Sequence, residues 1–129
     1  MIKALVVDDD RMQRKLLSIY LDTIAYIDFA ENGAEGVSLA TQALENGAPY
    51  ELICLDITMP VMDGLSALKA IRELESQSST KRSLIFMISA SSLPQDMIDA
   101  IEEGDCDDYV VKPIIKDNFI KLLNKHALA

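Results

Sequence analysis

Short apolar runs alternate with longer segments of helical periodicity along the whole chain, five times over. Apolar residues that recur every three or four positions predict amphipathic helices, and short continuous apolar runs predict buried strands. The predicted strands cover residues 4–7, 26–30, 52–55, 84–88 and 108–111. The predicted helices cover residues 11–22, 34–45, 65–75, 92–103 and 116–126.

Local signals predict the ends and faces of several helices. Ser92, with Gln95 three residues later, is the predicted N-cap of the fourth helix, and Gly104 is predicted to end it. The inward faces are predicted to hold Met12, Leu16, Ile19 and Tyr20 in the first helix, Leu65, Leu68 and Ile71 in the third, and Phe119, Leu122 and Leu123 in the last.

Alternation of strands and helices with short connections predicts right-handed crossovers and a parallel sheet. The first, third and fourth strands are continuous apolar runs, which is typical of central strands, whereas the second and fifth carry Asp28 and Asp108 and are placed at the edges. The predicted fold is therefore α/β, a doubly wound five-stranded parallel sheet of the flavodoxin-like type, in the order 2-1-3-4-5. Its switch point predicts a cleft between residues 8–10 and Asp56.

Composition narrows the class of protein. A chain of 129 residues predicts a single domain, and the net charge of -9 argues against direct nucleic-acid binding and against binding to an anionic membrane. No apolar run approaches the roughly 20 residues of a membrane span, and the acidic start is unlike a signal peptide, so we expect a cytoplasmic location. Cys54 is expected to act as a small apolar side chain. Cys106 lies in an acidic loop that should raise its pKa, so a disulfide is not expected.

Up to four carboxylates are predicted to meet at the ends of two neighbouring strands. Residues 8–10 are all aspartate and follow the first strand directly, and Asp56 ends the third. One acid at that position is explained by helix capping, but three exceed what a cap needs. A cluster of carboxylates requires a hard divalent cation, and Mg²⁺ suits this ligand set.

Two further polar groups end neighbouring strands. Ser89 follows the fourth strand and Lys112 follows the fifth. Taken singly, Ser89 is better explained as a loop serine, and Lys112 is a weak signal that a surface lysine before a turn would also explain. Together with the acids they place a hydroxyl and an ammonium at the same edge of the sheet, where a lysine can hold a carboxylate or a phosphoryl oxygen.

The ordered motifs LVVDDD, AENG, LDITMPVMDG, ISA and DDYVVKP resemble those of the two-component response-regulator receiver domains, the CheY-like family, over nearly the whole chain. The resemblance implies that residues 1–129 are one receiver domain and that Asp56 is the phosphoacceptor for a histidine kinase phosphohistidine. It also implies that Asp9 and Asp56 bind Mg²⁺ together with the Thr58 carbonyl, while Asp8 acts mainly through water.

The same resemblance assigns the remaining groups of the site. Lys112 would contact a phosphoryl oxygen, and Ser89 would hydrogen-bond the phosphoryl group. Tyr109 would swing inward to follow Ser89, which would switch the surface of the fourth helix, fifth strand and fifth helix. The Lys112–Pro113 bond would be cis. The expected role is signalling rather than enzymatic, with self-phosphorylation and autodephosphorylation as the only reactions.

The implied partners are a sensor histidine kinase or phosphotransfer protein, and a downstream protein or C-terminal output domain. Asp10 is an additional acid, expected to face solvent or to cap the first helix, and Gly36 interrupts the second. The approach to the fifth strand is strongly acidic, which favours a partner surface with basic residues, at Glu102, Glu103, Asp105, Asp107 and Asp108. A phosphorylation-dependent homodimer stays open, although the basic residues of the winged-helix dimer mode are not evident.

Two other protein classes share part of this pattern. A magnesium-dependent phosphatase of the haloacid dehalogenase type also uses an aspartate nucleophile after a strand, but it needs a second aspartate where this chain has Thr58. In a flavodoxin-like electron carrier, residues 8–10 would repel the flavin phosphate. The sequence leaves open whether the receiver is a single-domain regulator or part of a longer protein, and we favour the modular form.

Overall fold

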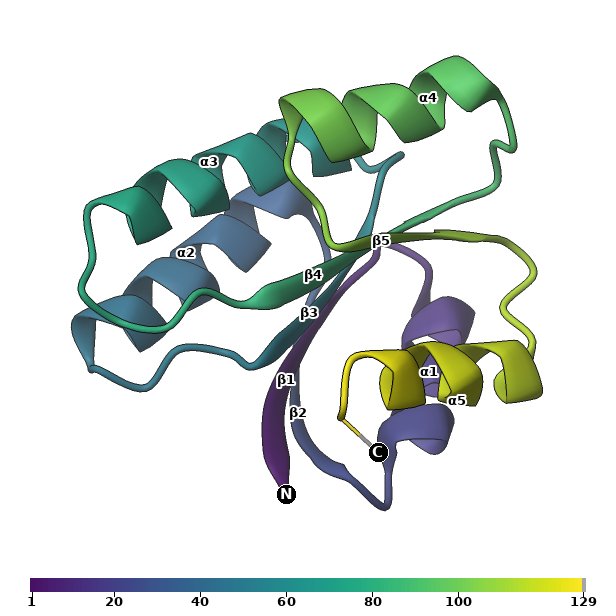
Figure 1. Cartoon of the computed structure of the whole chain (residues 1–129), viewed down its shortest axis with the longest axis horizontal. Coiled ribbons are helices and arrows are strands. Elements are labelled where there is room, and N and C mark those ends of the chain that lie inside the picture. Colours follow the sequence, from purple (N-terminus) through teal and green to yellow (C-terminus); the bar gives the residue numbers. More distant parts are fainter. Residues whose placement is uncertain (129) are drawn as a thin grey trace.

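The computed structural model describes residues 1–128 and shows a five-stranded parallel sheet between two layers of helices (Figure 1). The strand order is β2-β1-β3-β4-β5, so the predicted topology and both predicted edge strands are confirmed. The strands are β1 (Ile2–Val7), β2 (Ala25–Ala30), β3 (Leu52–Asp56), β4 (Leu84–Ser89) and β5 (Asp108–Val111).

Helices cover both faces of the sheet. Figure 1 shows α1 and α5 on one side of the sheet and α2, α3 and α4 on the other. An apolar core lies between the sheet and the helices on each side. One core contains Leu17 of α1 and Phe119 of α5, and the other contains Leu68 and Ile71 of α3. The helices are α1 (Arg11–Leu21), α2 (Gly33–Glu45), α3 (Gly64–Ser76), α4 (Pro94–Ile98) and α5 (Lys116–Lys125).

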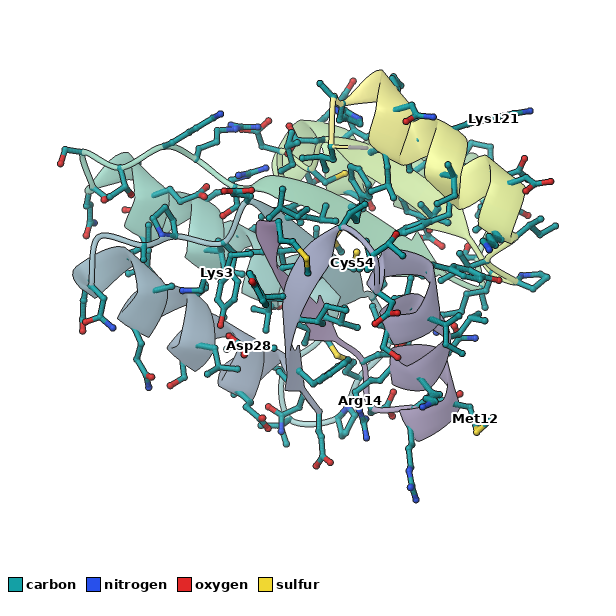
Figure 2. The ribbon with its side chains drawn as sticks, turned by 90° about the horizontal axis from the view of Figure 1, so that it is seen from below. Lys3, Met12, Arg14, Asp28, Cys54 and Lys121 are labelled. Atoms are coloured by element: carbon teal, nitrogen blue, oxygen red, sulfur yellow. The ribbon has the colours of Figure 1, made fainter. Side chains whose placement is uncertain are left out.

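The inward face predicted for α1 is partly wrong. Met12 and Ile19 are 74% and 57% exposed, whereas the buried side chains are Leu17 and Leu21. Figure 2 shows Met12 pointing away from the sheet at one end of α1, while Cys54 lies inside the molecule. Helix α1 carries apolar residues on more than one face, so periodicity alone does not select the face that packs on the sheet. The predicted faces of α3 and α5 are confirmed.

The predicted helix from Ser92 to Glu103 ends at Gly104 as expected, but its start is corrected. Helix α4 begins at Pro94 with Leu93 as N-cap, the Leu93 side chain makes no capping bond, and a π-helical turn η1 (Asp99–Glu103) follows. Proline is favoured in the first turn because its fixed φ suits the helix and its missing N–H is not needed there. The hydroxyl that serves this helix start belongs to Ser91, which accepts from the Leu93 N–H at 3.2 Å.

Gly36 has a packing reason inside α2. A Cβ at this position would lie 2.9 Å from Cγ2 of Val7, a buried β-branched side chain on β1. Helix α2 therefore approaches the sheet closely where the sequence has its unexpected glycine.

The two cysteines are buried and free in the part of the chain that the structure describes, and Cys54 lies inside β3 as predicted. Burial raises the pKa of the Cys54 thiol to about 12. Burial, followed by the negative charges of Asp107 and Asp108, raises the pKa of Cys106 to about 11. Neither thiol is poised as a nucleophile.

None of the helices within residues 1–128 combines the length and the apolar character that a membrane crossing requires.

Candidate functional site

Three aspartates meet at the carboxyl end of the sheet, at the switch point between β1 and β3. Asp8 directly follows β1 and Asp56 ends β3, and both are buried, at 2% and 5% exposure. Asp9 is exposed, and one oxygen from each of the three carboxylates lies within 4.8 Å of the others. Close carboxylate oxygens of this kind are suited to a hard divalent cation.

Lys112 lies across the buried pair. Its Nζ is 3.4 Å from Oδ2 of Asp8 and 3.4 Å from Oδ1 of Asp56. The Lys112 backbone N–H donates to the Ser89 carbonyl at 2.7 Å, which ties the end of β5 to the end of β4, and the following Lys112–Pro113 peptide is cis. One ammonium facing two buried carboxylates leaves a net negative charge that a bound cation would balance.

The pKa of Asp56 reflects this shortage of positive charge. Burial and, second, the neighbouring charge of Asp8 raise it, Lys112 and the Thr58 backbone N–H lower it, and the net result is a pKa of about 6. The carboxylate is thus held in a site where its charge is poorly compensated by the protein alone. A divalent cation would favour the ionised form.

The loop between β3 and α3 passes very close to Asp56. The Gly64 N–H donates to the Ile57 carbonyl at 2.7 Å, and a Cβ on Gly64 would overlap the Asp56 carbonyl oxygen. Asp63 caps α3 by accepting from the Ser66 N–H at 2.8 Å. The Asp63-Gly64 pair therefore holds the loop over the site. From the sequence, this pair indicated a turn but not its contact with Asp56.

Asp10 and Arg14 position Asp8 rather than join the cluster. The Asp10 N–H donates to Asp8 Oδ1 at 2.9 Å, and the Asp10 side chain caps α1 by accepting from the Met12 N–H, which confirms the capping prediction. Arg14, which no motif in the sequence indicates as a site residue, donates from Nη1 to the Asp8 carbonyl at 2.8 Å.

Ser89 and Tyr109 are joined through a third residue. Ser89 is buried, and its Oγ accepts from the Ser91 N–H at 3.0 Å. The Tyr109 hydroxyl donates to the Ser91 carbonyl at 3.1 Å, and its ring packs against the core under α3. Ser89 and Tyr109 therefore both bond to the backbone of Ser91, a residue that was not among the predicted site residues.

The acidic approach to β5 is not an open acidic surface. Arg72 Nη2 lies 2.7 Å from Asp107, Arg82 Nη1 lies 2.6 Å from Asp105, and Lys69 pairs with Glu103 at 3.5 Å. Asp108 pairs with Lys125 at 3.0 Å. Four of the five acids that suggested a basic partner are thus matched within the chain, which removes the main support for that prediction.

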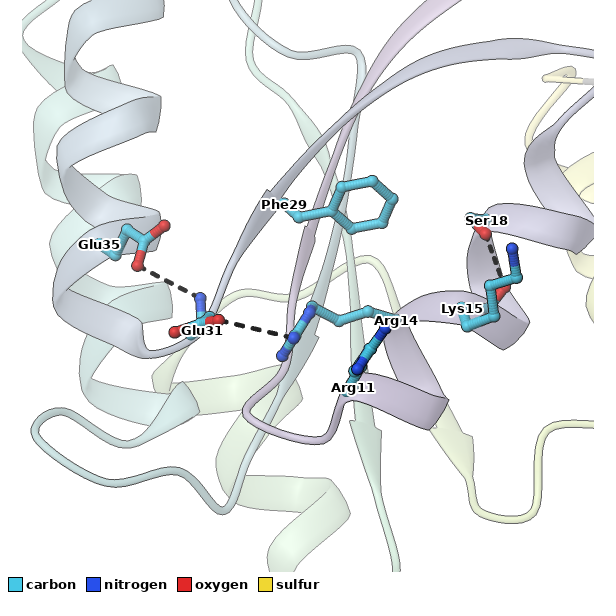
Figure 3. A pocket seen from close by; sticks show the side chains of 7 residues that line it. All are labelled: Arg11, Arg14, Lys15, Ser18, Phe29, Glu31 and Glu35. Atoms are coloured by element: carbon cyan, nitrogen blue, oxygen red, sulfur yellow. Dashed lines mark hydrogen bonds and ion pairs between the residues drawn. The ribbon is translucent and has the colours of Figure 1, made fainter.

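An open groove along α1, which we name the α1 groove, is lined by three cationic side chains, Arg11, Arg14 and Lys15. Figure 3 shows Arg14 reaching across it from α1 to Glu31, where the two charged groups are 3.6 Å apart. Arg14 also donates to the Asp8 carbonyl, so this side chain connects the groove to the carboxylate cluster. The groove is lined by Arg11, Arg14, Lys15, Ser18, Phe29, Glu31 and Glu35.

Comparison with known sequences finds one family over almost the whole chain. The profile of the response regulator receiver domain matches residues 4–124. The chain is 34% identical over 125 residues to the chemotaxis protein CheY of Bacillus subtilis, covering 95% of this chain and 95% of that protein. It is 39% identical over 112 residues to the transcriptional regulatory protein ResD of the same species, covering 86% of this chain but only 42% of ResD. It spans 7% of a Dictyostelium discoideum hybrid signal transduction histidine kinase, with 33% identity.

Solved structures have the same fold. The CheX–CheY–BeF₃–Mg²⁺ complex from Borrelia burgdorferi matches with a TM-score of 0.85 and 26% identity, covering 98% of this chain and 90% of that one. The complex of the Saccharomyces cerevisiae phosphotransfer protein Ypd1 with the receiver domain of Ssk1 matches with a TM-score of 0.83 and 26% identity, covering 96% of this chain and 87% of that one.

Proposed function

Because this chain belongs to the response regulator receiver family of two-component signalling, we propose that Asp56 accepts a phosphoryl group from a phosphohistidine. The observation that carries this proposal is the position of the Asp56 carboxylate. It ends a buried strand, it lies 3.4 Å from the Lys112 ammonium, and it shares a 4.8 Å cluster with Asp8 and Asp9. In this proposal residues 1–129 act as one receiver unit.

The transfer is a displacement at phosphorus. A carboxylate oxygen of Asp56 forms the new P–O bond, and the P–N bond of the phosphohistidine breaks with its electron pair returning to the imidazole. Phosphoryl transfer depends mainly on positioning and on neutralising charge. Lys112 faces the carboxylate and supplies one positive charge, and Ser89 supplies a hydroxyl at the end of the neighbouring strand.

We include Mg²⁺ as the cofactor of this step. Asp8, Asp9 and Asp56 offer the oxygen ligands that Mg²⁺ prefers, and one lysine does not balance their charge. The Thr58 carbonyl is proposed as a further ligand, with Asp8 acting mainly through water. Bound Mg²⁺ would neutralise the charge that develops between the carboxylate and the incoming phosphoryl group.

The proposed phosphodonor is a sensor histidine kinase or a phosphotransfer protein. A receiver domain is bound by Ypd1 in the yeast complex, which supports a donor of this type. The α1 groove reaches the carboxylate cluster through Arg14, which bonds to the Asp8 carbonyl, and it offers cations beside the exposed Phe29 ring. We propose this surface for donor docking, because a donor bound there would hold its phosphohistidine beside Asp56.

The proposed output goes to a downstream protein or to a C-terminal output domain. ResD and the hybrid kinase are much longer than this chain, which supports the modular form, whereas CheY is of similar length. Self-phosphorylation and autodephosphorylation are the only reactions assigned to the domain. Two free, buried cysteines fit the reducing cytoplasm proposed as its location.

The central test is labelling of the chain by acetyl phosphate. In the presence of Mg²⁺, intact mass should show one added phosphoryl group, and Asp56→Asn should abolish it because the amide is not a nucleophile. Asp10→Asn is the matched control, because asparagine caps a helix as well as aspartate does. Label that persists in Asp56→Asn would disprove the assignment.

The same assay tests the metal. Removing Mg²⁺ from the wild type with EDTA should greatly slow the labelling of Asp56. Replacing Asp9 with alanine should have the same effect in the presence of Mg²⁺. Labelling at the full rate without Mg²⁺ would contradict the proposed cofactor while leaving Asp56 as the acceptor.

A further inference from the structure

Ser91 uses all of its hydrogen-bonding groups to join three parts of the molecule. Its N–H donates to Ser89 Oγ at 3.0 Å, and its carbonyl accepts from the Tyr109 hydroxyl at 3.1 Å. Its own hydroxyl donates to Asp96 Oδ2 at 2.5 Å and accepts from the Leu93 N–H at 3.2 Å.

The start of α4 depends on these bonds. Pro94–Ile98 contributes no buried side chain, and Leu93 provides no side-chain cap. In a common N-terminal arrangement, an acid at the third helical position bonds directly to the N–H of the cap residue. Here Asp96 occupies that position but reaches the Leu93 N–H only through the Ser91 hydroxyl. We name this chain of bonds, from Leu93 through Ser91 to Asp96, the Ser91 clasp.

We propose that Ser91 is a positioning residue that couples the Ser89 hydroxyl to the first turn of α4. This inference rests on the proposed function, because it takes Ser89 as the hydroxyl that turns toward a phosphoryl group on Asp56. When Ser89 Oγ turns to donate there, it leaves the Ser91 N–H without its acceptor. Ser91 is half-buried, and we expect its backbone to move so that the N–H recovers a hydrogen-bond partner.

The Ser91 clasp transmits this backbone movement to α4. Asp96 and Leu93 are both bonded to the Ser91 hydroxyl, so the first turn of α4 moves with Ser91. The Tyr109 hydroxyl is released or carried along by the Ser91 carbonyl. One local change at Ser89 therefore reaches α4 by hydrogen bonds, without requiring side chains of α4 to repack in the core.

The test uses the full chain with beryllofluoride and Mg²⁺ as the probe, followed by backbone amide NMR. In the wild type, amides near Asp56 and Lys112 and amides of the α4 first turn should all shift on addition. In Ser91→Ala, which keeps the backbone N–H and carbonyl but removes the hydroxyl, the shifts near Asp56 and Lys112 should remain. The α4 shifts should be largely lost.

Two further variants make the result specific. Ser92→Ala is the matched control, because Ser92 is exposed and the Leu93 N–H bonds to the Ser91 hydroxyl, so the α4 response should be unchanged. Asp96→Ala removes the other end of the clasp and should lose the same response, and Ser91→Thr should restore it by returning a hydroxyl.

The outcomes separate this inference from the proposed function. If the wild type shows no shifts near Asp56, the proposed function fails and the coupling with it. If Ser91→Ala keeps the full α4 response, or if Ser92→Ala loses as much, the clasp does not carry the coupling. Loss of beryllofluoride binding in Ser91→Ala would assign Ser91 to the phosphoryl site itself and would also overturn this role.

Discussion

Single residues at the carboxyl end of the sheet determine the electrostatic state of the site. Asp8 and Asp56 are buried side by side, and Lys112 is the cation that faces both. The raised pKa of Asp56, at about 6, shows that burial and the Asp8 charge outweigh the Lys112 ammonium. A site in this state binds a cation readily because the cation removes an existing repulsion.

The residue-scale prediction concerns the stability of the metal-free protein. Between about pH 4 and about pH 6, native Asp56 holds a proton that the unfolded chain has already released, so its contribution to stability falls as the pH rises. Replacing Asp56 with asparagine should remove that loss and raise the free energy of unfolding near neutral pH by about 1–2 kcal/mol. Urea titrations of both proteins across this pH range measure the difference.

Asp10→Asn is again the control and should leave the slope of stability against pH close to that of the wild type. Saturating Mg²⁺ should stabilise the wild type more than Asp56→Asn, since the variant lacks one ligand. Equal stability of the wild type and Asp56→Asn at neutral pH would show that the ionised Asp56 carboxylate does not destabilise the folded protein.

At the scale of secondary-structure elements, close approaches explain residues that helix propensity disfavours. Gly36 lies inside α2, where alanine would ordinarily be more stable by about 1 kcal/mol. The position faces Val7 on β1, and a Cβ there would lie 2.9 Å from a Val7 methyl. The stiff, buried valine cannot move aside easily, so the packing of α2 on β1 favours glycine at position 36.

We therefore predict that Gly36→Ala destabilises the protein, by about 1–2 kcal/mol in urea unfolding, because overpacking outweighs the gain in helix propensity. A double-mutant cycle with Val7→Ala should show favourable coupling, since the smaller side chain removes the contact. A Gly36→Ala variant more stable than the wild type would mean that α2 is free to shift away from β1.

At the scale of the whole molecule, a buried ionic network holds α3 to the amino ends of β4 and β5. The Arg72 guanidinium lies 2.7 Å from both Glu75 and Asp107 and also donates to the Ser83 carbonyl at 2.8 Å. The Arg72 and Glu75 side chains are only 10% and 5% exposed. The network lies at the opposite end of the sheet from the carboxylate cluster, where it joins segments that are distant in the sequence.

Removing the charge of Arg72 should be strongly destabilising. Arg72→Met keeps an apolar stem but leaves Glu75 buried without its partner, so we expect a loss of about 3–5 kcal/mol in urea unfolding. Lys69→Met is the matched control on the same helix, because the Lys69–Glu103 pair is exposed and should contribute less than about 1 kcal/mol. Similar losses in the two variants would show that burial does not set the strength of these pairs.

The sequence by itself determined the order of elements, the strand order and the set of groups at the carboxyl end of the sheet. Apolar runs and helical periodicity are local signals, and the rules of parallel sheets convert them into one topology. Because that topology brings the ends of β1, β3, β4 and β5 to one edge, Asp8, Asp56, Ser89 and Lys112 could be placed near one another before any contact was known.

Only the tertiary structure decided how those groups and their surroundings are paired. Periodicity could not show that Leu17 rather than Met12 faces the core, and capping rules selected Ser92 where Ser91 makes the bonds. The acids before β5 are matched by Arg72 and Arg82, which lie more than twenty residues away in the sequence. Such contacts depend on which surfaces packing brings together, and a local pattern carries no record of a partner that is distant in the chain.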